Sequence, residues 1–240
     1  DAGATLAYTE GDSATTIDGT LTITDVDDTN IEGATITISS GYQASEDVLA
    51  LGNTGLGISV ASNSSGVLTL TGSTTKANYE TALESVTYFN SNTNDPNNSN
   101  RTITWVVSDG TANSSGVTST ITVADTNDAP VLSDAGATLA YTEGDSATTI
   151  DSSLTITDGD DTNIEGATIT ISSGYQSSED VLSLGNTGLG ISVASNSSGV
   201  LTLTGSTTQA NYEIALESVT YFNSNTNDPN NSNRTITWLI

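Results

Sequence analysis

The chain contains no cysteine, no methionine and no histidine, and Lys76, Arg101 and Arg234 are the only basic residues among its 240. The lack of cysteine excludes disulfides, a thiol nucleophile and thiolate metal sites. The lack of histidine removes the commonest general base and the commonest ligand of transition metals. A secreted protein of this composition must therefore be stabilised by burial of a core, by hard metal ions, or by both.

Positive charge is almost absent, because 29 acidic residues stand against three basic ones and give a net charge of −26. Nucleic-acid binding requires clustered lysine and arginine, so this composition argues against nucleic acid and against anionic membrane surfaces as partners. No apolar run approaches the ~20 residues needed to span a bilayer. We expect an extracellular or cell-surface fragment, or a mature piece without signal peptide, whose natural partners are cations.

Apolar and polar residues alternate with a period of two, as in residues 21–24 and 36–39. This pattern predicts half-buried strands with threonine on the exposed face. The predicted strands of the first half are 4–9, 16–24, 33–39, 57–61, 66–71, 85–90, 101–108 and 117–124. The period breaks over residues 73–83, where one or two helical turns are expected.

The chain is an internal repeat, because residues 1–107 and 134–240 can be aligned with an offset of 133 and differ at nine of 107 positions. Such a long period fits a whole domain with its own core rather than a solenoid unit. Short strands separated by turn residues predict an all-β protein of two tandem β-sandwich domains, 1–128 and 129–240, each with one short helical segment.

The second copy ends at Ile240, before any equivalent of the strand predicted at 117–124. Two interpretations are open. The chain is an excerpt of a longer array of the same repeat, which we favour, or a neighbouring chain supplies the final strand and assembles filaments.

The boundary between the copies reads Asp125-Thr126-Asn127-Asp128-Ala129-Pro130, directly after a predicted strand. This Asp-x-Asn-Asp-x-Pro run resembles the linker of cadherin repeats and of the cadherin-like repeats of large bacterial surface adhesins. Asp158-Gly159-Asp160 resembles the Asp-x-Asp motif of that family, and Tyr8-Thr9-Glu10 its first strand. The resemblance implies a cadherin-like (Ig-like, Greek-key) sandwich and calcium at the joints.

The resemblance also implies a role for each acidic position. Glu10 would complete the site at this joint, with Asp125, Asn127 and Asp128 from the linker and Asp158 and Asp160 from the next domain. Asp25 and Asp27, with Asn30, would serve a preceding joint, and Glu143 a following one. Asn163 would add a backbone carbonyl, and Asp109 is a weaker candidate.

Calcium chemistry supports this set independently of the resemblance. Calcium binds six to eight oxygens of carboxylates, amides and backbone carbonyls. In extended backbone Asp158 and Asp160 point the same way, so both side chains can face one ion. The alternative is that such residues only form turns, and for Asp12 and Asp95 we prefer that interpretation.

Two departures from the family weaken the resemblance. The region before the penultimate strand, 91–100, has Asp95 as its single acidic residue, where cadherins carry an acidic motif. Ala129 stands where cadherins usually have a second asparagine. We therefore expect fewer ions per joint.

Three functions are compatible with these observations to different degrees. The favoured one is a calcium-rigidified structural and adhesive spacer, whose partners are further copies of the repeat. A carbohydrate-binding module would need an exposed aromatic surface, for which Tyr42 and Tyr175 are the candidates. An enzyme acting through paired carboxylates is disfavoured, since every acidic residue has a turn or metal interpretation.

Overall fold

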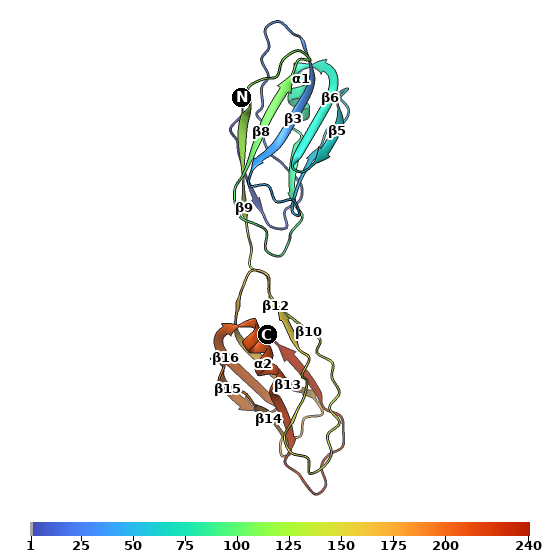
Figure 1. The fold of residues 1–240 in the computed structure, drawn as a ribbon. Coiled ribbons are helices and arrows are strands. Elements are labelled where there is room, and N and C mark those ends of the chain that lie inside the picture. The colour runs from blue at the N-terminus through green and yellow to red at the C-terminus, as the bar shows by residue number, and fades with distance from the viewer. Residues whose placement is uncertain (1) are drawn as a thin grey trace. The chain divides into compact units, whose positions relative to one another are not determined.

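The computed structural model describes residues 2–240, which form two compact units, 2–126 and 127–240. The chain passes from one unit to the other between Thr126 and Asn127, two residues before the boundary that the sequence predicted. The predicted all-β sandwich is confirmed, and each unit carries one short helix (Figure 1). No helix in the described part of the chain is long and apolar enough to cross a membrane.

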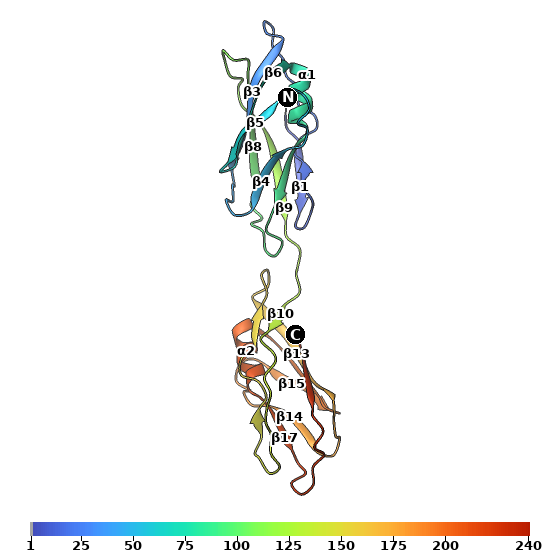
Figure 2. The same cartoon turned by 90° about the vertical axis from the view of Figure 1, so that its right-hand side faces the viewer.

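Within residues 2–126, the first unit contains nine strands and one helix. They are β1 (Thr5–Thr9), β2 (Thr15–Thr16), β3 (Asn30–Ser40), β4 (Asp47–Leu51), β5 (Ser59–Ser64), β6 (Val67–Thr75), α1 (Lys76–Leu83), β7 (Val86–Asn90), β8 (Arg101–Ser108) and β9 (Val117–Ala124). One sheet has the order β1-β9-β8-β3-β6-β5 and the other β2-β7-β4. Figure 2 shows the two layers of this unit from the side.

The second unit repeats most of this arrangement. Its elements are β10 (Val131–Ser133), β11 (Thr148–Thr149), β12 (Thr155–Thr157), β13 (Asn163–Ser173), β14 (Asp180–Leu184), β15 (Ser192–Ser197), β16 (Val200–Thr208), α2 (Gln209–Glu217), β17 (Val219–Asn223) and β18 (Thr235–Leu239). The larger sheet has the order β15-β16-β13-β18, and two smaller sheets have the orders β11-β17-β14 and β10-β12.

The period-two pattern explains how the strands pack. In β8, Ile103 and Trp105 point inward and are 0% and 2% exposed, while the intervening threonines are half-buried. Helix α1 begins after Thr75, whose side chain accepts a hydrogen bond from the backbone N–H of Asn78. Such an N-cap fixes the start of a short helix.

Two details of the predicted elements were wrong. The predicted strand 16–24 is reduced to Thr15–Thr16, and residues 17–24 continue without strand pairing. The strand Asp47–Leu51 was not predicted. It begins with a buried acid, Asp47, and its apolar Val48 is exposed, so it does not follow the pattern of apolar residues inside and polar residues outside.

Candidate functional site

The side chain of Glu10, directly after β1, reaches the end of β9 in the first unit. Its Oε2 accepts hydrogen bonds from the backbone N–H (3.1 Å) and the hydroxyl (2.9 Å) of Thr126. Its Oε1 is shielded from solvent and meets no donor among the described residues. Because a buried carboxylate oxygen without a donor is unfavourable, this oxygen is suited to a cation.

A similar arrangement occurs at the start of the second unit. The backbone N–H of Asp128 donates to Oδ2 of Asp160 at 2.9 Å. Oδ1 of Asp160 is buried and has no donor within the described part of the chain. The structure thus brings together Asp128 and Asp160, which the sequence had assigned to one site from positions 32 residues apart.

Asp158 lies beside Asp160, and the two carboxyl groups interact. Desolvation, followed by the neighbouring carboxylates of Asp160 and Asp161, raises the pKa of Asp158. The backbone N–H of Asp128 lowers the pKa of Asp160. Two carboxyl groups whose pKa values are pushed apart in this way repel one another unless a proton or a cation lies between them.

The equivalent loop of the first unit is held by a lysine. Nζ of Lys76 donates to the backbone oxygens of Asp25 (2.6 Å) and Asp28 (2.7 Å). The backbone N–H of Asp28 lowers the pKa of Asp25, whereas desolvation and the charge of Asp109 raise the pKa of Asp28. The loop therefore gathers several negative charges around one tethered ammonium group.

In the second unit Gln209 replaces this lysine and keeps the same two contacts. Its Nε2 donates to the backbone oxygens of Asp158 (3.0 Å) and Asp161 (2.6 Å). The loop geometry is retained, but the positive charge is lost. The acidic loop of the second unit has no cationic side chain in this position.

The remaining predicted ligands lie at the surface. Asp125, Asn127, Asp27, Glu143 and Asn163 are exposed. The amide of Asn127 donates to the backbone oxygen of Asp128 at 2.6 Å. Among residues 2–240 no group of three or more acidic side chains is arranged to hold a metal ion by itself. A calcium ion would thus need amide and backbone oxygens besides the carboxylates.

These residues fit calcium in their chemistry. The ligand set consists of hard oxygens, and Glu10 and Asp160 each present a buried oxygen that has no hydrogen-bond donor among the described residues. Such oxygens are the ligands that calcium prefers over nitrogen or sulfur. When bound, the ion would neutralise carboxylates that otherwise repel each other.

A buried arginine, whose role was not predicted from the sequence, organises the loop of residues 91–100. The guanidinium of Arg101 is fully buried and forms an ion pair with Asp47 at 3.0 Å and with Glu46 at 3.3 Å. It also donates to the backbone oxygens of Asn97 and, at 2.5 Å, Ser99. An asparagine-rich loop is thereby pinned to the body of the domain.

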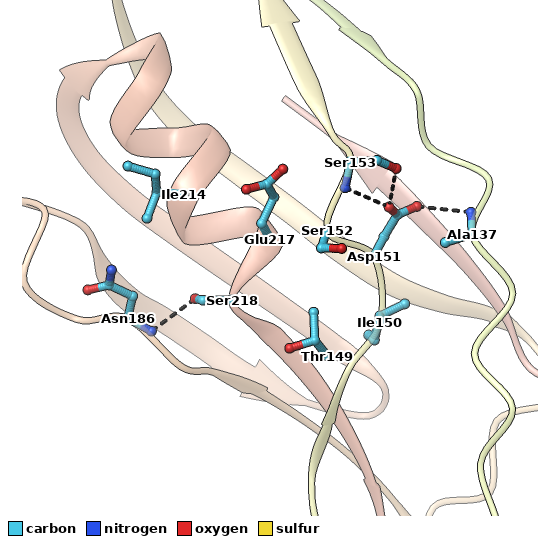
Figure 3. A pocket seen from close by; sticks show the side chains of 10 residues that line it. All are labelled: Ala137, Thr149, Ile150, Asp151, Ser152, Ser153, Asn186, Ile214, Glu217 and Ser218. Atoms are coloured by element: carbon cyan, nitrogen blue, oxygen red, sulfur yellow. Dashed lines mark hydrogen bonds between the residues drawn. The ribbon is translucent and has the colours of Figure 1, made fainter.

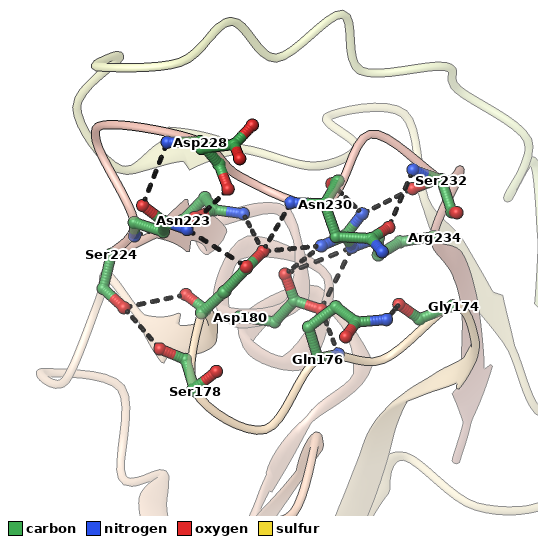
Figure 4. Close-up of polar contacts among 12 residues, drawn as sticks. Gly174, Gln176, Ser178, Asp180, Asn223, Ser224, Asp228, Asn230, Ser232 and Arg234 are labelled. Carbon is green, nitrogen blue, oxygen red and sulfur yellow. Dashed lines mark hydrogen bonds and ion pairs between the residues drawn. The ribbon is translucent and has the colours of Figure 1, made fainter.

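Arg234 occupies the same place in the second unit (Figure 4). It pairs with Asp180 at 2.9 Å and with Glu179 at 3.5 Å, and its side chain is 11% exposed. The hydrogen bonds from Arg234 to Asp180 raise the pKa of the guanidinium. One signal was available in the sequence, since a Glu-Asp pair and an arginine recur in both copies of a chain that is otherwise nearly free of basic residues.

A second buried acid, Asp18, joins three segments of the first unit. It accepts hydrogen bonds from the backbone N–H of Ala4 (3.1 Å), from Thr20, and from the hydroxyl of Ser119 (2.7 Å). Burial alone would raise its pKa, but the bonds from Ser119 and Thr20 outweigh it and lower the pKa to about 2. Asp18 is therefore an ionised structural group.

The equivalent Asp151 lines a surface pocket of about 550 Å³ in the second unit (Figure 3). Glu217 on α2 and Ile214 line the same pocket, and Asp151 accepts a hydrogen bond from the N–H of Ala137 at 3.0 Å. Burial alone would raise the pKa of Asp151, but the N–H groups that it accepts lower it. The carboxylate is thus engaged in backbone contacts.

The two tyrosines that are candidates for carbohydrate binding, Tyr42 and Tyr175, are partly covered by the protein. Tyr42 packs against the core of the first unit and is half-buried. Its ring lies so close to Gly66 that an added Cβ there would come within 2.8 Å of it. Tyr175 has the same relation to Gly199. One side of each ring is therefore packed against a glycine, and sugar binding by these tyrosines stays a prediction.

Comparison with known proteins finds a relative over part of the chain. Halomucin of Haloquadratum walsbyi contains a segment that is 43% identical over 91 residues, which covers 34% of this chain and 1% of halomucin. The chain therefore matches a very small part of that protein. No family model and no solved structure matches the chain, so the cadherin-like assignment stays a prediction from the linker residues.

Proposed function

We propose that the chain is a pair of non-enzymatic structural repeats from a large surface-associated extracellular protein, and that calcium stiffens the connection between the repeats. The likeness to a segment of halomucin supports a repeat within a much longer protein. The near-identity of the two copies supports a spacer, because a spacer gains length from each added copy.

The calcium part of the proposal rests on one observation. Glu10 and Asp160, on either side of the linker in sequence, each hold a buried carboxylate oxygen that meets no donor within residues 2–240. Linker residues Asp125, Asn127 and Asp128 would supply further oxygens, and Asp158 would share the ion with Asp160. Asp25, Asp27 and Glu143 would act in the same way at neighbouring joints.

The test is a calcium titration at constant ionic strength, because sodium alone also screens a net charge of −26. Binding to the folded state at 100 times Kd adds about 2.7 kcal/mol to the free energy of unfolding. We expect calcium to raise the melting temperature by several degrees and to narrow the distribution of distances between labels on the two units. A chelator should reverse both effects, and magnesium at the same concentration should have a weaker effect than calcium.

A matched pair of variants localises the effect. Asp160→Asn should abolish most of the calcium response. Asp228→Asn removes the same charge from an exposed loop of the same unit and should leave the response intact. Equal responses to calcium and magnesium, or an unchanged response in Asp160→Asn, would show that only general screening operates.

A further inference from the structure

Each unit carries an aspartyl-prolyl peptide bond in its asparagine-rich loop. The sequence has three prolines, of which Pro96 and Pro229 follow an aspartate and Pro130 follows an alanine. The bond before proline is a tertiary amide, and its nitrogen leaves as a basic secondary amine. An aspartate can also reach its own carbonyl carbon with a side-chain oxygen, because this closes a five-membered ring within one residue. These two bonds are therefore open to attack from within the chain.

A side-chain amide is aimed at the carbonyl group of the first of these bonds. Nδ2 of Asn92 donates to the backbone oxygen of Asp95 at 2.6 Å. The amide is held in this orientation, because its Oδ1 accepts a hydrogen bond from the backbone N–H of Asn94 at 3.2 Å. The backbone oxygen of Asp95 is the atom that becomes negative when the carbonyl carbon is attacked. A preorganised donor at such an oxygen stabilises the transition state.

The second unit repeats this arrangement at its own aspartyl-prolyl bond. Nδ2 of Asn225 donates to the backbone oxygen of Asp228 at 2.8 Å, and its Oδ1 accepts from the N–H of Asn227 at 3.2 Å. Asp228 lies at the edge of the polar network around Arg234 (Figure 4). The donor at the carbonyl oxygen is therefore a property of the repeat and not of one copy.

The attacking carboxyl group of Asp95 is available. The residue is exposed, and its carboxyl oxygens accept no hydrogen bond from the described residues. Asp12, for which we also preferred a role in a turn, differs in this respect, because its Oδ2 accepts the N–H of Thr9 at 2.8 Å. In the turn at Asp95 the backbone oxygen makes the contact, and the carboxyl group is left for other chemistry.

The chain is held on both sides of the bond between Asp95 and Pro96. Before the bond, Nδ2 of Asn92 also donates to Oε1 of Glu46 at 3.4 Å. After it, the N–H of Asn97 donates to Oε2 of Glu46 at 3.1 Å, and the buried guanidinium of Arg101 donates to the backbone oxygen of Asn97. Pro96 itself is buried. Holding reacting groups in place in this way favours an intramolecular reaction over the same reaction in a flexible chain.

We propose that the chain cleaves its own backbone between Asp95 and Pro96 and between Asp228 and Pro229. A carboxyl oxygen of the aspartate bonds to the carbonyl carbon of the same residue, and the bond from that carbon to the proline nitrogen breaks. The carboxyl proton moves to the nitrogen, which leaves as a secondary amine. The cyclic anhydride that remains on the aspartate takes up one water and becomes two carboxyl groups. Each bond is cut once, so this is a reaction of the chain on itself and not an enzyme activity on a substrate.

Cleavage in the first unit would leave its pieces together. The cut falls between β7 and β8, and β8 pairs antiparallel with β3, which lies on the other side of the cut in sequence. Arg101 on β8 also forms its ion pair with Asp47 across the cut. The nicked unit therefore stays assembled until it is denatured. The proposal does not depend on calcium, and it holds or fails whatever the result of the calcium titration.

The test follows the freshly purified 240-residue chain during incubation at mildly acidic pH, with denaturation before mass spectrometry. We expect fragments that end at Asp95 and Asp228 and fragments that begin at Pro96 and Pro229. A peptide of residues 89–100 gives the rate of the same bond without the fold, and the folded chain should cleave at least about tenfold faster. Hydroxylamine should trap the anhydride as a hydroxamate at the new C-terminus. The sequence has no Asn-Gly bond, which hydroxylamine would also cleave.

The two bonds serve as controls for one another within one molecule. Asp95→Asn should abolish cleavage before Pro96 and leave the second bond unaffected, and Asp228→Asn should do the reverse. Asn92→Ala should slow only the first bond, by about tenfold or more. The exposed Asp95→Asn change keeps the test valid if Asn92→Ala folds poorly. A rate in the folded chain no higher than in the peptide, cleavage that persists in Asp95→Asn, or absence of the hydroxamate would overturn the proposal.

Discussion

The aligned parts of the two units have almost the same sequence, and the first unit continues into strand β9, which pairs with β8 and β1. The first unit has a six-stranded sheet, and the corresponding sheet of the second unit has four strands. Arg101 has a side-chain exposure of 0%, and Arg234 has 11%. Arg101 and Arg234 occupy equivalent positions, and Arg101 lies opposite Ile121 of β9, so β9 accounts for the lower exposure of Arg101.

The largest expected effect on the free energy of unfolding comes from replacing Arg101, and it should exceed the effect of replacing Arg234. Arg101→Ala should lower the free energy of unfolding of the first unit by about 3–5 kcal/mol, because it leaves Asp47 buried without its partner. Arg234→Ala should cost less, about 1–3 kcal/mol, since its network is partly hydrated. Hydrogen exchange followed separately in peptides from each unit would measure both.

Arg101→Lys is the matched control for charge. It keeps the positive charge but loses the forked contacts to Asp47 and to the loop of residues 91–100, so we expect a loss close to that of the alanine variant. If Arg101→Ala and Arg234→Ala have equal effects, the difference in burial between the units has no energetic consequence.

A smaller effect concerns Ser119 on β9, which links Asp18 and Trp105. Ser119→Ala should destabilise the first unit by about 1–3 kcal/mol at neutral pH, because Asp18 and Trp105 lose a hydrogen-bond partner. The pKa of Asp18 is lowered to about 2 from 3.8. Its ionised form therefore stabilises the fold above about pH 4, and this contribution is lost as the pH falls toward 2.

The pH dependence of the destabilisation caused by Ser119→Ala serves as a control. The difference between the parent chain and Ser119→Ala should narrow as the pH is lowered from about 5 to about 2, and the second unit should not respond. Unfolding by urea at several pH values, read by hydrogen exchange in each unit, provides the measurement. A difference that stays constant with pH would argue against a role for Asp18.

The smallest effect on the free energy of unfolding is expected when Lys76 and Gln209, which hold the acidic loops, are exchanged for one another. Lys76→Gln and Gln209→Lys should each change the free energy of unfolding by no more than about 0.5 kcal/mol, because both side chains make the same two backbone contacts. Under the calcium proposal, Gln209→Lys should weaken calcium binding a few-fold, and Lys76→Gln should strengthen it at the loop of the first unit. Calorimetry with calcium checks both, and identical affinities in all three chains would contradict it.

The sequence predicted the parts of the fold that follow from local pattern. Strands 101–108 and 117–124 and the helical segment within 73–83 were found, because period-two alternation and its interruption reflect which side chains face the core. It missed the strand Asp47–Leu51, since a buried acid at the start of a strand makes sense only once its partner Arg101 is known. That pairing spans 54 residues and leaves no local pattern.

The same distinction between local sequence pattern and contacts of distant residues applies to the candidate site. In the structure the carboxyl groups of Asp158 and Asp160 interact, and the backbone N–H of Asp128 donates to Asp160. Their shared role as calcium ligands stays a prediction. The exchange of Lys76 for Gln209 was visible in the sequence. Its meaning was not, because the contacts run to backbone oxygens, which every residue possesses.

The parallel pairing of β1 with β9 has a mechanical consequence. These are the first and last strands of the first unit, and five residue pairs join them in register from Thr5 and Thr120 to Thr9 and Ala124. Tension applied at the two ends of that unit pulls the strands past each other, so the hydrogen bonds resist as a group in shear instead of opening one after another.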